Sequence, residues 1–306
     1  MVRTVLILIV TLIVLPIVTF YVDDSSMSAD QKSVLMESLY ICIGFASGTF
    51  IISTLTRNYS QVDKIWSIAP LVYAWHIAWR GDWDPRLVLM ASLVSHWGLR
   101  LSYNFSRRGG YSWKFWEGEE DYRWAVLRQK PEFSGKWAWM AFNLFFISGY
   151  QCFLIWLFTM PIMVAYQGLE TPLMWLDYLA AALIVALIVM ETVADQQQWM
   201  YQQEKYRRIN AGEPLEGVYA KGFTHTGLWK ISRHPNYFAE QSIWVVFYFF
   251  SVAATGLWIN WSMSGCLLLL ILFRGSADFS EGISKEKYPE YAEYIRKTGR
   301  FIPKLF

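Results

Sequence analysis

Long apolar stretches recur from one end of this chain to the other, and they constrain its fold more than any other feature. A helix that crosses a bilayer needs about 20 mostly apolar residues, and somewhat fewer where the bilayer thins. Eight spans are predicted: Thr4–Val22, Val34–Thr54, Ile65–Trp79, Arg86–Phe105, Trp137–Tyr166, Leu173–Ala194, Gln241–Ala254 and Leu257–Phe273. Because the third and seventh are short, the expected fold is an all-α, polytopic membrane bundle of about seven or eight transmembrane helices.

Charge supports this interpretation. Charged residues make up only 17% of the chain, whereas soluble domains carry about a quarter. The net charge of +2 is too small to indicate nucleic acid as a partner. The first apolar stretch is long for a signal peptide, so we expect a true span there. Cys42, Cys152 and Cys266 all lie in apolar runs without metal-ligand spacing, which predicts neither a metal site nor a disulfide.

The distribution of basic residues predicts the orientation. With the N-terminus inside, only Lys32, Arg80 and Arg86 of the 27 Lys and Arg residues fall in outer loops. Arg100 falls within a span, which leaves 23 inside, as the positive-inside rule requires. We therefore expect both termini in the cytoplasm, with the protein in a bacterial inner membrane or an organelle membrane. Residues 1–55 would form N-terminal transmembrane helices and 56–306 a catalytic membrane domain.

Two groups of ionisable residues near span ends are candidate sites, because charged side chains are rare within membranes. Glu191 and Asp195 share one helix face with Gln198 nearby, and this face could bind a headgroup, a ribose hydroxyl or an amide. It could equally be a solvated helix end.

The second group consists of Asp63, His96, Arg100 and Tyr103, of which the last three share roughly one helix face. A buried Arg100 needs an anion, such as Asp63 or a ligand phosphate. Asp63 could be a helix-capping charge, an ionised partner of Arg100, or a desolvated acid that keeps its proton.

The strongest motif is the run Thr226–Glu240, which leads directly into an apolar span. Pro235 suits the first turn of a helix, and this would leave backbone N–H groups near Arg233 and His234. Arg, His and a helix N-terminus together favour a phosphate. After the last span come Arg274, Asp278, a tyrosine-rich KYPEYAEY segment and a terminal FIP.

Further motifs precede these: SQVDKIWSIAP at Ser60–Pro70, HWGLRLSYN at His96–Asn104, EEDYRW at Glu119–Trp124, and an AD-x-x-Q motif that ends at Gln198. Together with GLWKISRHPNYFAE they resemble the steroid 5α-reductase-like family of membrane proteins, most of all its largely uncharacterised, mostly bacterial branch. The resemblance covers roughly residues 55–306. It implies a bundle of about seven spans with NADPH under cytoplasmic loops and a lipophilic substrate taken from the bilayer lipids. The implied reaction is hydride transfer to a carbon–carbon double bond conjugated to a carbonyl.

The resemblance also implies roles for single residues. By position, Asn236 and Glu240 match residues that hold the cofactor, and Glu191 and Asp195 match a nucleotide-binding Asn-x-x-x-Asp pair with Glu in place of Asn. Arg274 matches a phosphate-binding Arg, and Asp278 matches a position where His is common. Asp63 matches a Glu that, together with a Tyr, polarises the substrate carbonyl. We count Gln198, Arg233, His234 and Tyr237 as further cofactor candidates.

One departure and two alternatives stay open. The position expected to supply the Tyr aligns with Trp97, which has no acidic proton, so Tyr103, His96 or Arg100 would replace it or the substrate is not an enone. RHPxY before a span also occurs in S-adenosylmethionine-dependent membrane methyltransferases that resemble isoprenylcysteine carboxyl methyltransferases. A non-catalytic membrane subunit is the third possibility. The sequence leaves the substrate and the oligomeric state undefined.

Overall fold

A computed structural model of the chain describes residues 14–23, 26–114, 116 and 118–304. Within these residues the regular structure is helical, apart from one isolated bridge between Ser232 and Gly299. The chain divides into two compact units, which we describe separately. Unit 1 comprises residues 1–181 and 246–268, and unit 2 comprises residues 182–245 and 269–306.

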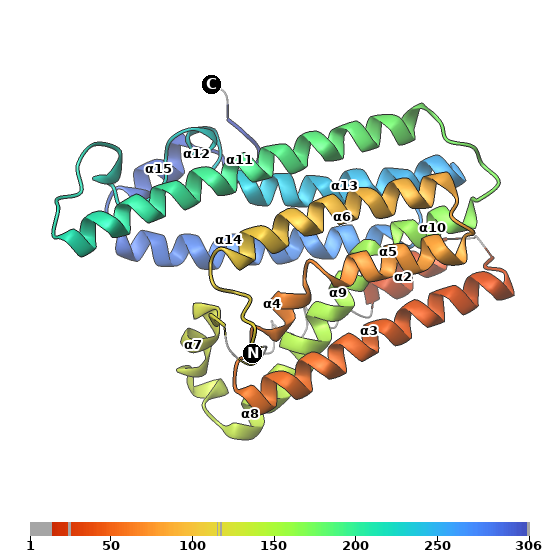
Figure 1. Ribbon diagram of the computed structural model, residues 1–306, viewed down its shortest axis with the longest axis horizontal. Helices are drawn as coiled ribbons and strands as arrows, with labels where there is room; N and C mark the ends of the chain where they lie inside the picture. Colours follow the sequence, from red (N-terminus) through yellow and green to blue (C-terminus); the bar gives the residue numbers. More distant parts are fainter. Residues whose placement is uncertain (1–13, 24–25, 115, 117, 305–306) are drawn as a thin grey trace. The chain divides into compact units, whose positions relative to one another are not determined.

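Most helical elements of the described chain lie entirely in unit 1 (Figure 1). They are α2 (Leu15–Val22), α3 (Ala29–Thr56), α4 (Gln61–Ile65), α5 (Ala69–Arg80), α6 (Pro85–Ser106), α7 (Tyr122–Arg128), η2 (Pro131–Phe133), α8 (Lys136–Phe142), η3 (Asn143–Tyr150), α9 (Gln151–Thr159) and α10 (Pro161–Gln167). Unit 2 contains η4 (Gly217–Tyr219), α12 (Leu228–Ile231) and α15 (Tyr291–Lys297). Three long helices contribute residues to both units: α11 (Trp175–Ala211), α13 (Pro235–Thr255) and α14 (Met263–Lys287).

Five helical segments of the described chain are long and apolar enough to cross a membrane. They are Ala29–Thr56, Lys136–Gln167, Trp175–Ala211, Pro235–Thr255 and Met263–Lys287. The protein is therefore an integral membrane protein of the all-α class, which confirms the predicted fold class. Of the first expected span, only the part that forms α2 lies within the described residues.

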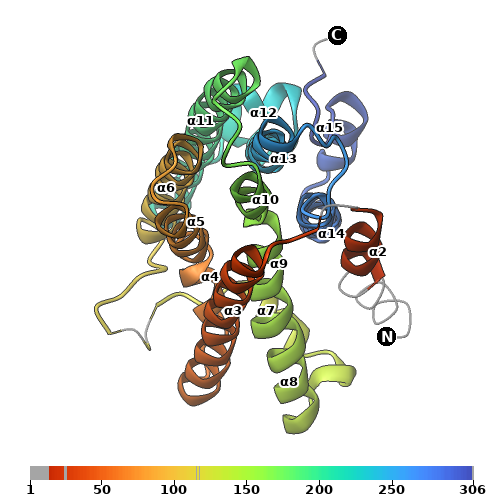
Figure 2. The same cartoon turned by 90° about the vertical axis from the view of Figure 1, so that its right-hand side faces the viewer.

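Capping residues define where two long helices of unit 1 begin. The Ser28 hydroxyl accepts a hydrogen bond from Gln31 N at 3.1 Å while the Gln31 side chain accepts from Ser28 N at 2.9 Å, so a capping box starts α3. The Asp84 carboxylate accepts from Arg86 N at 2.9 Å and Pro85 occupies the first turn of α6. Four residues connect α5 to α6, and the two helices run side by side in opposite directions (Figure 2).

The third predicted span is divided in the structure. Instead of one helix from Ile65 to Trp79, a short α4 precedes α5, which begins at Ala69 with Pro70 in its first turn. Proline has no backbone N–H and restricts the residue before it, so a helix restarts at Pro70 more readily than it continues through it. Asp63 consequently lies on α4 and not within a membrane helix.

One buried amide in the interior of unit 1 has its hydrogen bonds satisfied by neighbouring hydroxyl groups. Asn143 is fully buried where the helix Lys136–Gln167 widens to the π form in η3. Its amide nitrogen donates to the hydroxyls of Ser53 at 3.0 Å and Thr54 at 3.2 Å, and the Ser148 hydroxyl donates to its amide oxygen at 3.2 Å. Such pairing is required because bilayer lipid offers no substitute partner.

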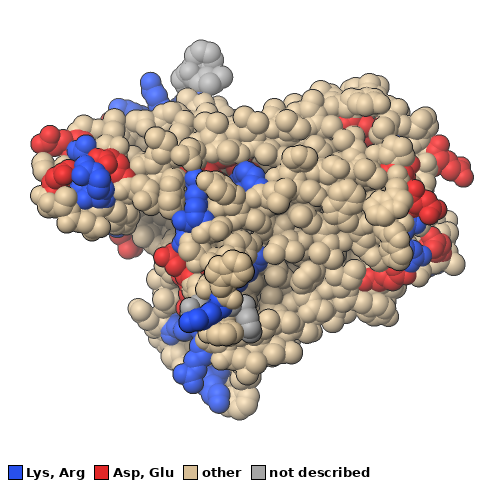
Figure 3. Space-filling view, viewed as in Figure 1, with Lys and Arg blue, Asp and Glu red and all other residues tan. Residues whose placement is uncertain are grey.

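Part of the surface of unit 1 carries no charged side chains. On the face shown in Figure 3, a broad band without charge separates acidic residues near the starts of α3 and α6 from basic residues near α7 and α8. This is the surface expected where apolar lipid surrounds the helices.

Candidate functional site

The motif that begins at Gly227 and the C-terminal segment are held together by backbone hydrogen bonds in unit 2. Arg233 N donates to Gly299 O at 2.8 Å, His234 N donates to Arg300 O at 3.0 Å, and Lys304 N donates to Ile231 O at 2.8 Å. The Gly227 motif and the C-terminal segment therefore fold together as one structural element.

A buried carboxylate organises this element. Glu281 on α14 accepts from Arg233 Nε at 2.8 Å, from His234 Nε2 at 3.1 Å and from Arg300 Nη2 at 3.1 Å. Glu281 is 2% exposed and Arg233 7%. The guanidinium of Arg233 also donates to the carbonyl oxygens of Ile295 and Thr298. Arg233 and His234, which the sequence predicts to bind a cofactor phosphate, thus fix the motif through Glu281.

A second contact joins the two predicted nucleotide motifs. The amide of Asn236, in the first turn of α13, donates to Asp195 Oδ1 on α11 at 3.1 Å. Asp195 is buried, as are Glu191 one turn before it and Glu240 one turn after Asn236. Glu240 Oε1 accepts from the indole of Trp244 at 3.1 Å. Three buried carboxylates and an amide thus lie at this contact or within one helical turn of it.

The remaining cofactor candidates have separate contacts within unit 2. The Thr224 hydroxyl donates to the amide oxygen of Gln198, which ties α11 to the loop before α12. Tyr237 stacks on the His234 ring with centroids 5.2 Å apart. On α14, Arg274 is exposed, and the exposed Asp278 accepts from Arg300 Nη1 at 2.7 Å. Arg274 is the candidate cation whose exposure leaves it accessible to a phosphate.

The tyrosine-rich segment has a structural part in the same unit. Phe223 packs against the rings of Tyr288, Tyr291 and Tyr294 at centroid distances of 5.6, 5.0 and 5.2 Å. The Tyr294 hydroxyl donates to the Trp229 carbonyl oxygen. These contacts hold α15 against the loop that carries the Gly227 motif.

In unit 1, Asp63 lines a pocket of about 330 Å³ together with Trp66, Phe105, Arg108 and the 119–123 segment. Desolvation raises the pKa of Asp63 to about 6, although hydrogen bonds from Ser60 and Trp124 and the charge of Arg123 act in the opposite direction. With this pKa, about half of the Asp63 carboxyl groups are protonated at pH 6 and about a tenth at pH 7.

Hydrogen bonds between two predicted motifs build this pocket. Ser60 Oγ accepts from Asp121 N at 2.9 Å and from the Trp124 indole at 3.2 Å, and Glu120 Oε1 accepts from Tyr59 N at 2.8 Å. The SQVDKIW and EEDYRW segments are thereby joined in one site.

The other catalytic candidates are placed differently. His96 is exposed, and its Nδ1 lies 2.8 Å from Ser92 O of its own helix. Tyr103 is also exposed, and neither it, His96 nor Arg100 is among the described residues that line the Asp63 pocket. Trp97 is fully buried. Another tyrosine contacts a residue of the pocket wall. The Tyr111 hydroxyl donates to Lys64 O at 2.9 Å and lies 3.2 Å from the hydroxyl of Ser67, which lines the pocket.

Comparison with known proteins places the chain in a family. Residues 49–298 match a family described as a protein of unknown function, DUF1295. The chain belongs to the DUF1295 family. An uncharacterised protein from Schizosaccharomyces pombe is 37% identical over 265 residues, which cover 83% of this chain and 75% of the relative. No solved structure matches the chain.

Sequence reasoning missed three residues that matter in this DUF1295 protein. Glu281 follows Arg274 and Asp278 at helical spacing, so the periodicity of α14 could have identified it. Arg300 and Tyr111 carried no comparable signal, because each acts on a residue distant in the sequence.

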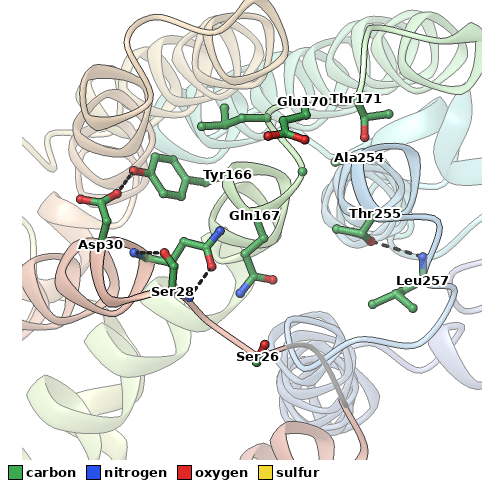
Figure 4. A pocket seen from close by; sticks show the side chains of 13 residues that line it. Ser26, Ser28, Asp30, Tyr166, Gln167, Glu170, Thr171, Ala254, Thr255 and Leu257 are labelled. Carbon is green, nitrogen blue, oxygen red and sulfur yellow. Dashed lines mark hydrogen bonds between the residues drawn. The ribbon is translucent and has the colours of Figure 1, made fainter.

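A larger cavity of unit 1, of about 610 Å³, contains none of the candidate residues (Figure 4). Asp30, Tyr166, Gln167, Glu170 and Thr255 are among its lining residues, and the Tyr166 hydroxyl donates to Asp30. Asp30 also accepts from Arg80 at 2.8 Å. The contacts of Asp30 with Tyr166 and Arg80 stabilise the ends of α3, α5 and α10.

Proposed function

We propose that this protein is an NADPH-dependent membrane oxidoreductase that reduces a carbon–carbon double bond conjugated to a carbonyl in a lipophilic substrate. The observation that carries the proposal is the hydrogen bond of 3.1 Å between Asn236 and Asp195. It joins two motifs that the resemblance to steroid 5α-reductase-like proteins assigns to one nucleotide. Sterol, isoprenoid and acyl lipids are the substrate classes that a bilayer supplies.

The residues of unit 2 fit a nucleotide with defined roles. Carboxylates such as Asp195 and Glu191 accept hydrogen bonds from ribose hydroxyls or an amide, and Asn236 can both donate and accept. The exposed Arg274 suits a phosphate. Arg233 and His234 keep the Asn236 turn in place through Glu281, so their part in this site is positioning. Bound NADPH would supply the hydride.

In unit 1, Asp63 would hold the polar end of the substrate. A protonated Asp63 donates a hydrogen bond to a carbonyl oxygen and thereby favours electron density on that oxygen. The rings of Trp66 and Phe105 offer apolar contact, and the overall reaction adds one hydride and one proton to the double bond.

For the orientation, we propose that both termini face the cytoplasm. The excess of Lys and Arg in the loops on that side supports this proposal. A bacterial inner membrane or an organelle membrane would hold the protein.

The pKa of Asp63 leads to a pH prediction. Burial raises this pKa to about 6, above the usual value of about 3.9, so the protonated form prevails below pH 6 and is lost above it. We expect kcat/KM to be level below about pH 6 and to fall by about tenfold per pH unit above it. Asp63→Asn should lower turnover by about 10²–10⁴-fold, the scale of general acid catalysis, and should abolish the inflection.

The measurement is the initial rate of loss of the nicotinamide absorbance, with enones that carry sterol, polyisoprenyl and acyl tails. Glu119→Gln changes another carboxylate of the same pocket and should retain the inflection. A pH profile of the wild-type protein without an inflection near pH 6, or full turnover by a folded Asp63→Asn variant, would exclude Asp63 as the acid.

A further inference from the structure

A separate pocket of unit 2 is lined by the first half of the Gly227 motif and by the C-terminal segment. Its volume is about 670 Å³, within the range of small-molecule sites. The lining comes mainly from the two ends of α12 and from α15 (Figure 1). None of the ten residues predicted to bind the cofactor lines it, so its chemistry is not accounted for by the proposed nucleotide site.

The charge of this pocket is strongly positive. Lys221, Lys230, Lys297 and Lys304 line it against a single carboxylate, Glu293. Lys297 pairs with Glu293 at 2.5 Å and Lys221 pairs with Glu290 at 3.1 Å. Among the described residues, no carboxylate lies within ion-pair distance of Lys230 or Lys304.

A neutral donor accompanies these cations. The side chain of Thr226 is exposed at the pocket, and His225 also lines it, with Nδ1 directed at Phe223 O at 3.0 Å. The wall is completed by Ile231 and by Tyr294, whose hydroxyl is already bonded to Trp229 O. Ammonium groups and a hydroxyl around a concave wall are donors that bind phosphate oxygens.

The local backbone holds the two unpaired lysines in this arrangement. Lys230 lies on α12, and Lys304 follows the terminal FIP and is tied to the end of α12 by the bond from its own N–H to Ile231 O, 2.8 Å long. Two cations from distant parts of the chain are thereby kept at one pocket, although repulsion would separate them in a flexible chain.

We propose that this pocket is a second anion site, which binds a phosphate group through Lys230, Lys304 and Thr226. The phosphate belongs to the headgroup of an anionic lipid or to a soluble phosphorylated compound. The site is independent of the cofactor, because its residues and those of the nucleotide site do not overlap.

The test uses the purified full-length protein and two probes. Inorganic pyrophosphate is titrated by calorimetry in a neutral detergent, and retention of phosphatidic acid against phosphatidylcholine is measured by native mass spectrometry. We expect Lys230→Gln/Lys304→Gln to weaken pyrophosphate binding by at least about tenfold, which corresponds to about 1.4 kcal/mol. The control Lys136→Gln/Lys285→Gln removes the same charge from two exposed lysines outside the pocket and should leave binding unchanged.

The two probes separate the sources of the phosphate. Selective retention of phosphatidic acid that the pocket variant loses would support the site and identify a lipid, whereas pyrophosphate binding without such retention would support it and identify a soluble ligand. Absence of binding to both probes would overturn the proposal. Equal losses in the pocket and control variants would overturn it as well, because they would show a general effect of net charge.

Discussion

Replacement of Glu281 by Gln is expected to lower the free energy of unfolding by about 3–5 kcal/mol, the scale for removal of one partner from a buried ion pair. Glu281 neutralises the buried Arg233 and also accepts from His234 and Arg300. A neutral glutamine would leave the Arg233 charge without its counter-ion. Urea unfolding in detergent, followed by tryptophan fluorescence, measures the change.

A matched control is Glu293→Gln, which removes a carboxylate whose partner Lys297 is largely exposed. Exposed pairs of this kind contribute about 0–1 kcal/mol. Equal stability of Glu281→Gln and the wild-type protein would contradict the role of Glu281 as the organising residue of unit 2.

The second large effect is expected at the start of α6 in unit 1. Arg86 is 1% exposed and Asp177 is fully buried, and the guanidinium of Arg86 contacts both carboxylate oxygens at 2.8 and 3.0 Å. Arg86 also donates to the carbonyl oxygens of Thr171 and Pro172 at 2.9 and 2.8 Å. We expect Arg86→Met to lower the free energy of unfolding by about 3–5 kcal/mol, because Asp177 would remain as a buried charge.

The double variant Arg86→Met/Asp177→Leu distinguishes the ion pair from simple loss of packing. Since it removes both charges, it should recover much of the stability that the single variant loses. The same unfolding experiment measures both. A double variant that is less stable than Arg86→Met would show that the pair itself is not the reason for the loss.

Hydropathy predicted the membrane helices well, because burial in lipid requires long apolar segments whatever their partners are. The predicted span from Val34 to Thr54 lies within α3. The predicted span from Arg86 to Phe105 covers most of α6, but α6 is not among the five described segments that are long and apolar enough to cross a membrane. Helix ends were harder to predict. Polar residues such as Asp195 and Gln198 continue α11 well past the predicted end at Ala194, because a helix that leaves the bilayer no longer needs apolar side chains.

Partners distant in the sequence could not be predicted. Arg86 was counted only as a basic residue of an outer loop, but it is buried against Asp177, which lies 91 residues away. Arg233 was predicted to bind phosphate, and its charge is in fact directed at Glu281. Local sequence indicates that an arginine needs an anion, whereas the tertiary fold decides which anion it meets.

The motifs were more informative when taken in pairs. The contact between Asn236 and Asp195 joins two segments that the sequence assigned to one nucleotide, and the contacts of Ser60 join two more around Asp63. Tyr103, His96 and Arg100 were the predicted replacements for the phenol of a carbonyl-binding site, but Tyr103 is exposed. The Tyr111 hydroxyl instead lies 3.2 Å from Ser67, which lines the Asp63 pocket. Tyr111 follows a helix end and two glycines, where periodicity gives no guidance.

The most direct test of the central claim is an equilibrium titration of the purified protein with NADPH, followed by nicotinamide fluorescence and challenged with S-adenosylmethionine. We predict saturable binding of NADPH that S-adenosylmethionine does not displace. Arg274→Ala should weaken this binding by about 1.5–3 kcal/mol, the scale of a charge-assisted hydrogen bond, while Lys285→Ala on the same helix should not. Saturable binding of S-adenosylmethionine with no binding of NADPH would contradict the account and favour a methyltransferase.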